Sequence, residues 1–162
     1  MRFTVKNKIY IKALLQSQYK KIDILKRLVD LTKEQAKLLE DSNFDQDVFT
    51  EIIEKKTKQI NQLSEIDDSF LKIFEQVKEE LYTNKGHENE IKELKDTINT
   101  ITDLSSKLQL DENSNKIKLE TYLTLKRKEV KDYKRSKSMA SSYQRNLDRQ
   151  DSASSHFFDS KK

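Results

Sequence analysis

The 162-residue chain contains no proline and only one glycine, Gly86. These two residue types most often end helices and open tight turns, so almost nothing in the sequence interrupts a long helix. Hydrophobic residues make up 34% of the chain and charged residues 37%. That balance suits elongated helices that each bury one narrow stripe better than a thick globular core. We therefore predict an all-α protein.

The available side chains argue against an enzyme. One glycine cannot build a phosphate-binding loop, a dinucleotide fingerprint or a nucleophile elbow. The chain has no cysteine, which excludes disulfides and thiolate metal sites. Its two histidines, His87 and His156, fall in a helix-start region and in the C-terminal segment, where we expect solvated side chains rather than metal ligands. We predict a non-enzymatic protein without a metal or cofactor.

The N-terminal region does not resemble a secretory signal, because Lys12 splits its apolar residues into two short groups. No later apolar run approaches the length that a membrane-spanning helix needs. We expect a cytoplasmic protein that does not insert into a membrane.

Apolar residues recur at alternating spacings of four and three in successive stretches of the chain. This spacing is typical of helices in bundles and coiled coils. It predicts helices over about residues 7–41, 45–84 and 87–118. Short connections make successive helices antiparallel, so residues 1–118 are expected to form an elongated, antiparallel three-helix bundle of coiled-coil-like packing.

The two connections carry recognisable helix-end chemistry. Asp45 is placed to cap the second helix, and Phe44 is placed to pack against Phe49. Gly86 suits the left-handed conformation that ends a helix, because it has no β-carbon. These signals fix the expected ends of the second helix.

Several polar side chains fall on the predicted buried stripes of the three helices. They are Gln18, Thr32, Lys56, Asp67, Ser105, Glu112 and Asn115. For Asp67 we expect an ion pair with Lys56 or with a basic residue of the first helix, or a local shift that packs Ile66 in its place.

The third helical pattern keeps its register far beyond residue 118. Residues 119–150 are therefore predicted to be a protruding basic helix that outruns the two shorter helices. One face of it, here called the 119–147 stripe, is formed by Leu119, Tyr122, Leu123, Val130, Tyr133, Ala140, Tyr143 and Leu147. Tyrosine offers a large contact area with little rotamer entropy to lose, which favours a surface that binds another polypeptide.

Two alternatives remain for this segment. In the first, the helix breaks at residues 111–115, where weak helix formers cluster, and residues 116–150 fold back as a fourth helix. In the second, the stripe is the seam of a homodimeric, structural coiled coil. Residues 116–150 also carry eleven basic and four acidic side chains, which makes nucleic acid a further, weaker candidate partner.

Residues 151–162 lack helical period and are predicted to be a flexible tail, in which Phe157 and Phe158 form a candidate docking motif.

Short segments spread over most of the chain carry a family resemblance. In the first half they are Tyr10-Ile11, Leu14-Leu15, Ile22-Asp23-Ile24-Leu25, Thr32-Lys33-Glu34-Gln35, Phe49-Thr50-Glu51-Ile52-Ile53-Glu54-Lys55-Lys56, Ile60-Asn61-Gln62-Leu63 and Ile66-Asp67-Asp68-Ser69-Phe70. In the second half they are Asp96-Thr97-Ile98, Ile101-Thr102-Asp103-Leu104-Ser105, Asp151-Ser152 and the closing Phe157-Phe158-Asp159-Ser160-Lys161-Lys162. In these segments the chain resembles flagellar export chaperones of the FlgN and FliT type, particularly the clostridia-like versions. None of the segments is a catalytic motif.

The resemblance implies a cytoplasmic helical chaperone for hook–filament junction proteins or the filament cap protein. In such proteins the C-terminal helical part binds the client and delivers it to components of the type III export apparatus. The 119–147 stripe would then be the client-binding face, although the stripe itself follows from periodicity.

Overall fold

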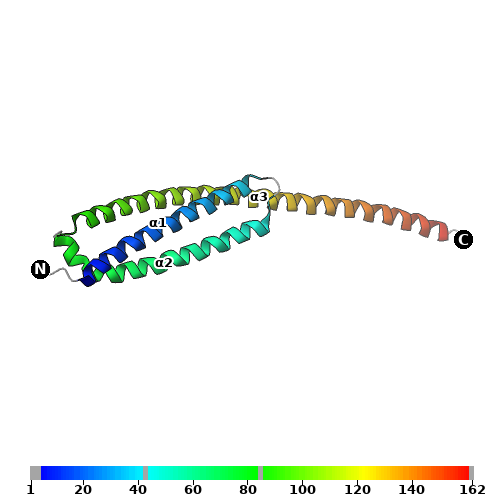
Figure 1. Ribbon diagram of the computed structural model, residues 1–162. Helices are drawn as coiled ribbons and strands as arrows, with labels where there is room; N and C mark the ends of the chain where they lie inside the picture. The colour runs from blue at the N-terminus through cyan, green and yellow to red at the C-terminus, as the bar shows by residue number, and fades with distance from the viewer. Residues whose placement is uncertain (1–4, 42–43, 84–85, 161–162) are drawn as a thin grey trace. The chain divides into compact units, whose positions relative to one another are not determined.

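The computed structural model describes the backbone of residues 5–41, 44–83 and 86–160, and within these ranges the side chains of residues 7–149. Three helices account for nearly all of them: α1 (Val5–Glu40), α2 (Gln46–Thr83) and α3 (Glu88–Ser160) (Figure 1). The described residues contain no strand, so the predicted all-α class is confirmed. The chain divides into two compact units, one ending at Lys118 and the other beginning at Leu119.

The ends of α2 follow the predicted local chemistry. The Asp45 carboxylate accepts hydrogen bonds from the backbone N–H groups of Asp47 (3.0 Å) and Val48 (3.3 Å), which have no partner within the helix. The rings of Phe44 and Phe49 lie 5.1 Å apart, centroid to centroid. Gly86 has a φ of 77°, a conformation that disfavours any residue with a β-carbon.

In the first unit, α1, α2 and residues 88–118 of α3 run side by side, with α2 antiparallel to both α1 and α3 (Figure 1). The α1 and α2 backbones approach within 8 Å, Cα to Cα, at many positions, whereas α3 hardly comes that close to either. The bundle is therefore a tight α1–α2 hairpin with a third helix held mainly through its side chains.

Helix α1 supplies most of the core. The residues on its predicted stripe are all buried or half-buried: Ile11, Leu15, Gln18, Ile22, Leu25, Val29, Thr32, Ala36 and Leu39. Near one end of the unit, Ile11 and Leu14 pack with Val77 of α2 and Leu94 of α3. Further along, Leu28 belongs to a second cluster that both neighbouring helices also contact. A helix that faces two neighbours buries a wide stripe, which is why Leu14, Ile24 and Leu28 are buried beside the predicted one.

The stripes predicted for α2 and for residues 88–118 of α3 face the core over most of their length, with Val77 and Leu94 buried among their members. Three apolar members of these stripes do not follow the prediction: Ile53, Ile60 and Ile98 were expected inside the bundle but are 43–52% exposed. Ile52 and Thr97, on the neighbouring rows, are each only 3% exposed. The physical reason is that α2 and α3 both pack against α1, so at these positions the side nearest to α1 turns inward. A single heptad register cannot reveal such a local change.

Helix α3 is continuous through residues 111–115, so the alternative with a break and a fourth helix there is wrong. The polar residues of this segment are held by specific partners. Asp111 forms an ion pair with Lys107 (3.3 Å), and the Asn115 side-chain amide donates to the Thr32 carbonyl of α1 (2.8 Å). An ion pair within α3 and a tertiary hydrogen bond to α1 therefore offset the low helix propensity of the segment.

The backbone of α3 reaches Ser160, beyond the helix end expected near residue 150. No proline or glycine follows Gly86, so nothing in the sequence enforces an earlier stop. The side chains of Phe157 and Phe158, the candidate docking motif, lie outside those that the structure describes.

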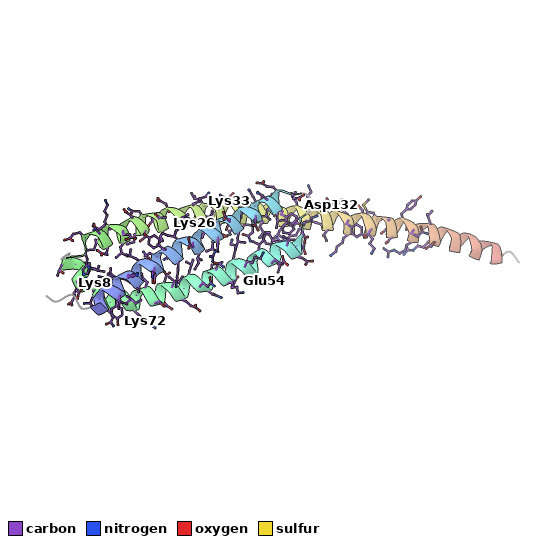
Figure 2. The ribbon with its side chains drawn as sticks, in the orientation of Figure 1. Lys8, Lys26, Lys33, Glu54, Lys72 and Asp132 are labelled. Carbon is purple, nitrogen blue, oxygen red and sulfur yellow. The ribbon has the colours of Figure 1, made fainter. Side chains whose placement is uncertain are left out.

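Charged side chains are distributed over the outer surfaces of both units. Exposed examples labelled in Figure 2 are Lys8, Lys26, Lys33, Glu54, Lys72 and Asp132. Within the described ranges, no helix is both long enough and apolar enough to cross a membrane.

Candidate functional site

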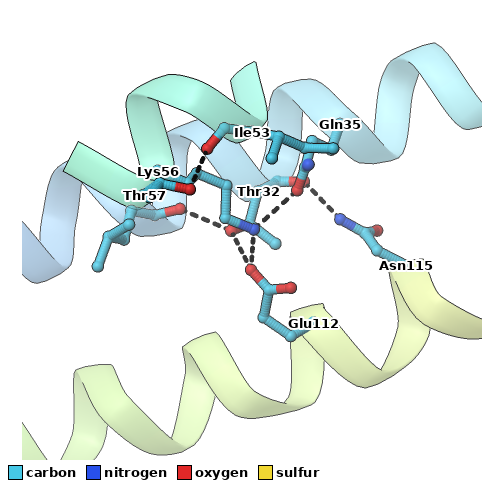
Figure 3. A network of polar contacts seen from close by, with 8 residues as sticks. Thr32, Gln35, Ile53, Lys56, Thr57, Glu112 and Asn115 are labelled. Carbon is cyan, nitrogen blue, oxygen red and sulfur yellow. Dashed lines mark hydrogen bonds and ion pairs between the residues drawn. The ribbon is translucent and has the colours of Figure 1, made fainter. Parts of the chain in front are cut away.

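A layer of polar side chains crosses the interior of the first unit and connects its three helices (Figure 3). The Lys56 ammonium of α2 donates to Gln35 Oε1 of α1 (2.8 Å) and to Glu112 Oε1 of α3. The Thr32 hydroxyl of α1 lies 3.1 Å from the same Glu112 oxygen, and the Thr32 carbonyl accepts from Asn115 of α3. We call these five residues the polar layer.

Burial shapes the chemistry of the polar layer. Lys56 is only 8% exposed, and desolvation of its ammonium lowers the pKa of Lys56 to about 8. The Glu112 side chain, by contrast, is 44% exposed, so its carboxylate keeps part of its hydration. A buried ion pair of this kind contributes little net stability but penalises any alignment of the helices that would separate its partners. The polar layer therefore specifies how α3 aligns with the α1–α2 hairpin.

Further polar contacts link the helices along the first unit. Asp67 of α2 pairs with Lys21 of α1 (2.8 Å), which confirms the expected partner on the first helix, and Ile66 also packs in the core. Lys118 of α3 pairs with Glu40 of α1 (2.7 Å) and lowers the pKa of the Glu40 carboxyl. Because α3 stays farther from its neighbours than they do from each other, the long side chains of the Lys118–Glu40 pair bridge the distance between α3 and α1.

His87 differs from the expectation of a solvated side chain. It is 2% exposed, and its Nε2 lies 3.7 Å from the Glu80 carboxylate of α2. The side chain of His156, the second histidine, lies outside the described set. Among the side chains that are described, no three His, Cys, Asp or Glu residues are grouped so as to hold a metal ion.

The second unit begins at Leu119, and its part of α3 carries the 119–147 stripe. Leu119 and Tyr122 are half-buried, whereas the other members of the stripe are exposed: Leu123, Val130, Tyr133, Ala140, Tyr143 and Leu147. Val130 is 52% exposed, Tyr133 66% and Tyr143 67%. Most of the stripe is thus apolar or aromatic surface in contact with solvent, as a binding face for another helix requires.

Two exposed apolar side chains beside the stripe were missed by the sequence interpretation. Leu125 is 56% exposed and Met139 is 65% exposed. They lie two heptads apart, on the row next to the stripe, so a search over neighbouring rows would have found them. They widen the apolar face at two points along its length.

Charged groups lie within and beside the stripe. The Lys126 ammonium sits 5.7 Å from the centre of the Tyr122 ring, within the range of a cation–π interaction. Lys126 also pairs with Glu129, one turn away, at 3.2 Å. Cations are therefore available along the edge of an apolar, tyrosine-bearing surface.

Comparison of the chain with protein-family models, with curated proteins and with solved structures finds no match. The candidate functional site therefore rests on the geometry described above. Most of the polar layer is buried within the bundle, whereas the 119–147 stripe is a continuous row of apolar and aromatic side chains, most of them exposed, along one helix.

Proposed function

We propose that the chain is a cytoplasmic chaperone that binds helical segments of flagellar export substrates, prevents their premature assembly and assists type III export. The observation that carries the proposal is the exposure of Val130, Tyr133 and Tyr143 along one face of a continuous helix. Apolar surface of this kind gains about 25 cal/mol for each Å² that a partner covers, before the ordering costs of association.

The mode of binding follows from the shape of this face. A single helix with a stripe at heptad spacing accepts another amphipathic helix laid along it, because the side chains of the two helices interdigitate at that spacing. The client would thus contribute an amphipathic helix, and the contact would cover apolar client surface that otherwise drives assembly.

The class of client comes from the family resemblance. It points to hook–filament junction proteins or the filament cap protein, and to transient contact with the export apparatus. Within the first unit, the polar layer would align residues 88–118 of α3 with the α1–α2 hairpin.

Capture of purified export substrates tests the proposal. The double variant Val130→Ser/Tyr133→Ser removes two exposed anchors and should reduce capture of junction or cap proteins at least tenfold, about 1.4 kcal/mol of binding free energy. Ser138→Ala/Ser142→Ala, on exposed positions of the same helix outside the stripe, is the matched control and should leave capture unchanged. Equal capture by the parent chain and the stripe variant would refute the assignment of the stripe as the client site.

A further inference from the structure

We infer that the helix that binds the 119–147 stripe is acidic along its flanks, and that a second copy of the same segment is not its natural occupant. The inference rests on the proposed function for the location of the binding face. It adds the chemistry by which that face distinguishes one amphipathic helix from another.

The charge of the segment gives the first reason. Residues 119–149 contain nine Lys or Arg and four Asp or Glu side chains, a net charge of +5. The basic residues are Lys126, Arg127, Lys128, Lys131, Lys134, Arg135, Lys137, Arg145 and Arg149. All nine are exposed, so this charge faces any helix that approaches.

The position of the cations relative to the stripe gives the second reason. Lys126 falls in the same heptad register as the stripe, and Lys137 lies seven residues beyond the stripe member Val130, on the same row of the helix. Arg127 follows Lys126 and Lys134 follows the stripe member Tyr133; the two cations lie seven residues apart and form a row along one edge. A helix packed on the stripe therefore meets cations both at the contact and along its border.

The acidic residues of the segment do not balance this pattern. Glu129 already pairs with Lys126, and Asp148 accepts a hydrogen bond from Gln144 (3.3 Å). Two copies of the segment packed together would place two charges of +5 at the short interaxial distance of helix pairs, roughly 8–10 Å, which is comparable to the screening length at physiological salt. Carboxylates on the partner remove that repulsion and pair with the cations instead.

Nucleic acid also attracts cations, but the apolar part of the face favours a protein partner. Phosphate groups do not cover Val130 or Leu123, whereas the leucine-type residues of an amphipathic helix do. The favoured occupant is thus a helix with an apolar stripe and acidic borders, and duplex DNA becomes an outcome of the test.

Two synthetic peptides of about four heptads provide the test. Both carry leucine at the two core positions of each heptad; the flanking positions carry glutamate in one peptide and lysine in the other. Binding of each labelled peptide to the full-length chain is measured by fluorescence anisotropy at about 0.05 M and about 0.5 M NaCl. The glutamate peptide should bind at least tenfold more tightly at low salt, and its advantage should shrink at high salt.

Charge-reversal variants locate the effect on the chain. Arg127→Glu/Lys134→Glu should weaken binding of the glutamate peptide about tenfold and strengthen binding of the lysine peptide. Lys26→Glu/Lys33→Glu is the matched control, because these exposed lysines of α1 have the same seven-residue spacing and give the same change in net charge. The control should change both affinities less than threefold. Val130→Ser/Tyr133→Ser should weaken the glutamate peptide, since the same stripe supplies the apolar contact.

Several outcomes would overturn the inference. The first is equal affinity for the two peptides, or binding of neither. The second is that Val130→Ser/Tyr133→Ser binds the glutamate peptide as tightly as the parent chain does. The third is tighter binding to duplex DNA than to the glutamate peptide at about 0.15 M NaCl. The unliganded chain could also sediment as a dimer. If Val130→Ser/Tyr133→Ser dissociated that dimer while Arg127→Glu/Lys134→Glu left it intact, the inference would be overturned. Failure of the proposed function gives a different result. Neither the parent chain nor its variants would then capture export substrates, whether or not the two peptides bind.

Discussion

Replacing Lys56 by methionine isolates the energetics of the polar layer. Methionine has a similar length and an apolar end, so the substitution removes the ammonium while largely filling the same space. Two partners lose a donor, Gln35 and Glu112. Their environments differ, because Gln35 is buried whereas the Glu112 side chain is 44% exposed and can turn its carboxylate to water.

The expected change in the free energy of unfolding is small because two terms oppose each other. Burial lowers the pKa of Lys56 from 10.5 to about 8, which corresponds to a desolvation penalty of at most about 3 kcal/mol at neutral pH and about half of that once partial solvent screening is allowed for. Methionine relieves this penalty. The unsatisfied Gln35 oxygen costs about 1–2 kcal/mol. Lys56→Met should therefore change stability by less than about 1 kcal/mol.

Removing the other partner should have a larger effect. Glu112→Ala leaves the Lys56 ammonium buried without its carboxylate, which should destabilise the bundle by about 2–3 kcal/mol. Combining it with Lys56→Met should recover most of that loss, since the uncompensated charge is then absent. This order, with the single Glu112 variant the least stable, is the signature of a buried ion pair.

The pH dependence provides an independent check with a defined sign. In the folded chain Lys56 releases its proton near pH 8, whereas in the unfolded chain it holds the proton until about pH 10.5. Between these values the unfolded state binds more protons, so the contribution of Lys56 to stability rises with pH in that window. Relative to Lys56→Met, the parent chain should therefore gain stability between pH 8 and pH 10.

Urea denaturation followed by circular dichroism measures these differences, at pH 7 and across the alkaline window. Lys55→Met is the matched control, because Lys55 is the exposed neighbour of Lys56 on the same helix and should show neither effect. A loss of more than about 2 kcal/mol in Lys56→Met, equal to that in Glu112→Ala, would refute the balance of terms described here.

Three further substitutions have expected outcomes on stability or binding. Leu28→Ala should destabilise the bundle by about 2–4 kcal/mol because Leu28 is 1% exposed, whereas Leu71→Ala, at a position 58% exposed, should cost less than about 0.5 kcal/mol in the same denaturation assay. Gly86→Ala should cost about 1–2 kcal/mol because φ is 77° there, and an unchanged denaturation midpoint would contradict the left-handed conformation. Val130→Ser/Tyr133→Ser should leave the thermal midpoint within about 2 °C of the parent chain while client capture falls; a large drop in the midpoint would mean that these side chains stabilise the fold.

Local sequence chemistry was sufficient to predict the helices and their connections. The scarcity of helix-breaking residues predicted long helices, and Asp45 and Gly86 marked the ends of α2 because capping and left-handed geometry depend on neighbouring residues only. The members of the α1 stripe that the heptad spacing indicated are likewise all buried or half-buried, since a helix that faces two neighbours buries a wide face.

Tertiary structure decided which single positions of α2 and α3 leave the predicted buried stripes and which polar residues meet. Ile52 and Thr97 are buried whereas Ile53 and Ile98 on the stripes are exposed, because the side of each helix that faces α1 depends on how the three helices are arranged. The polar residues near 112–115 suggested a helix break, yet Glu112 and Asn115 are held by partners 56 and 83 residues away along the chain. Spacing within one helix carries no information about such distant partners, so only the folded arrangement identifies the polar layer.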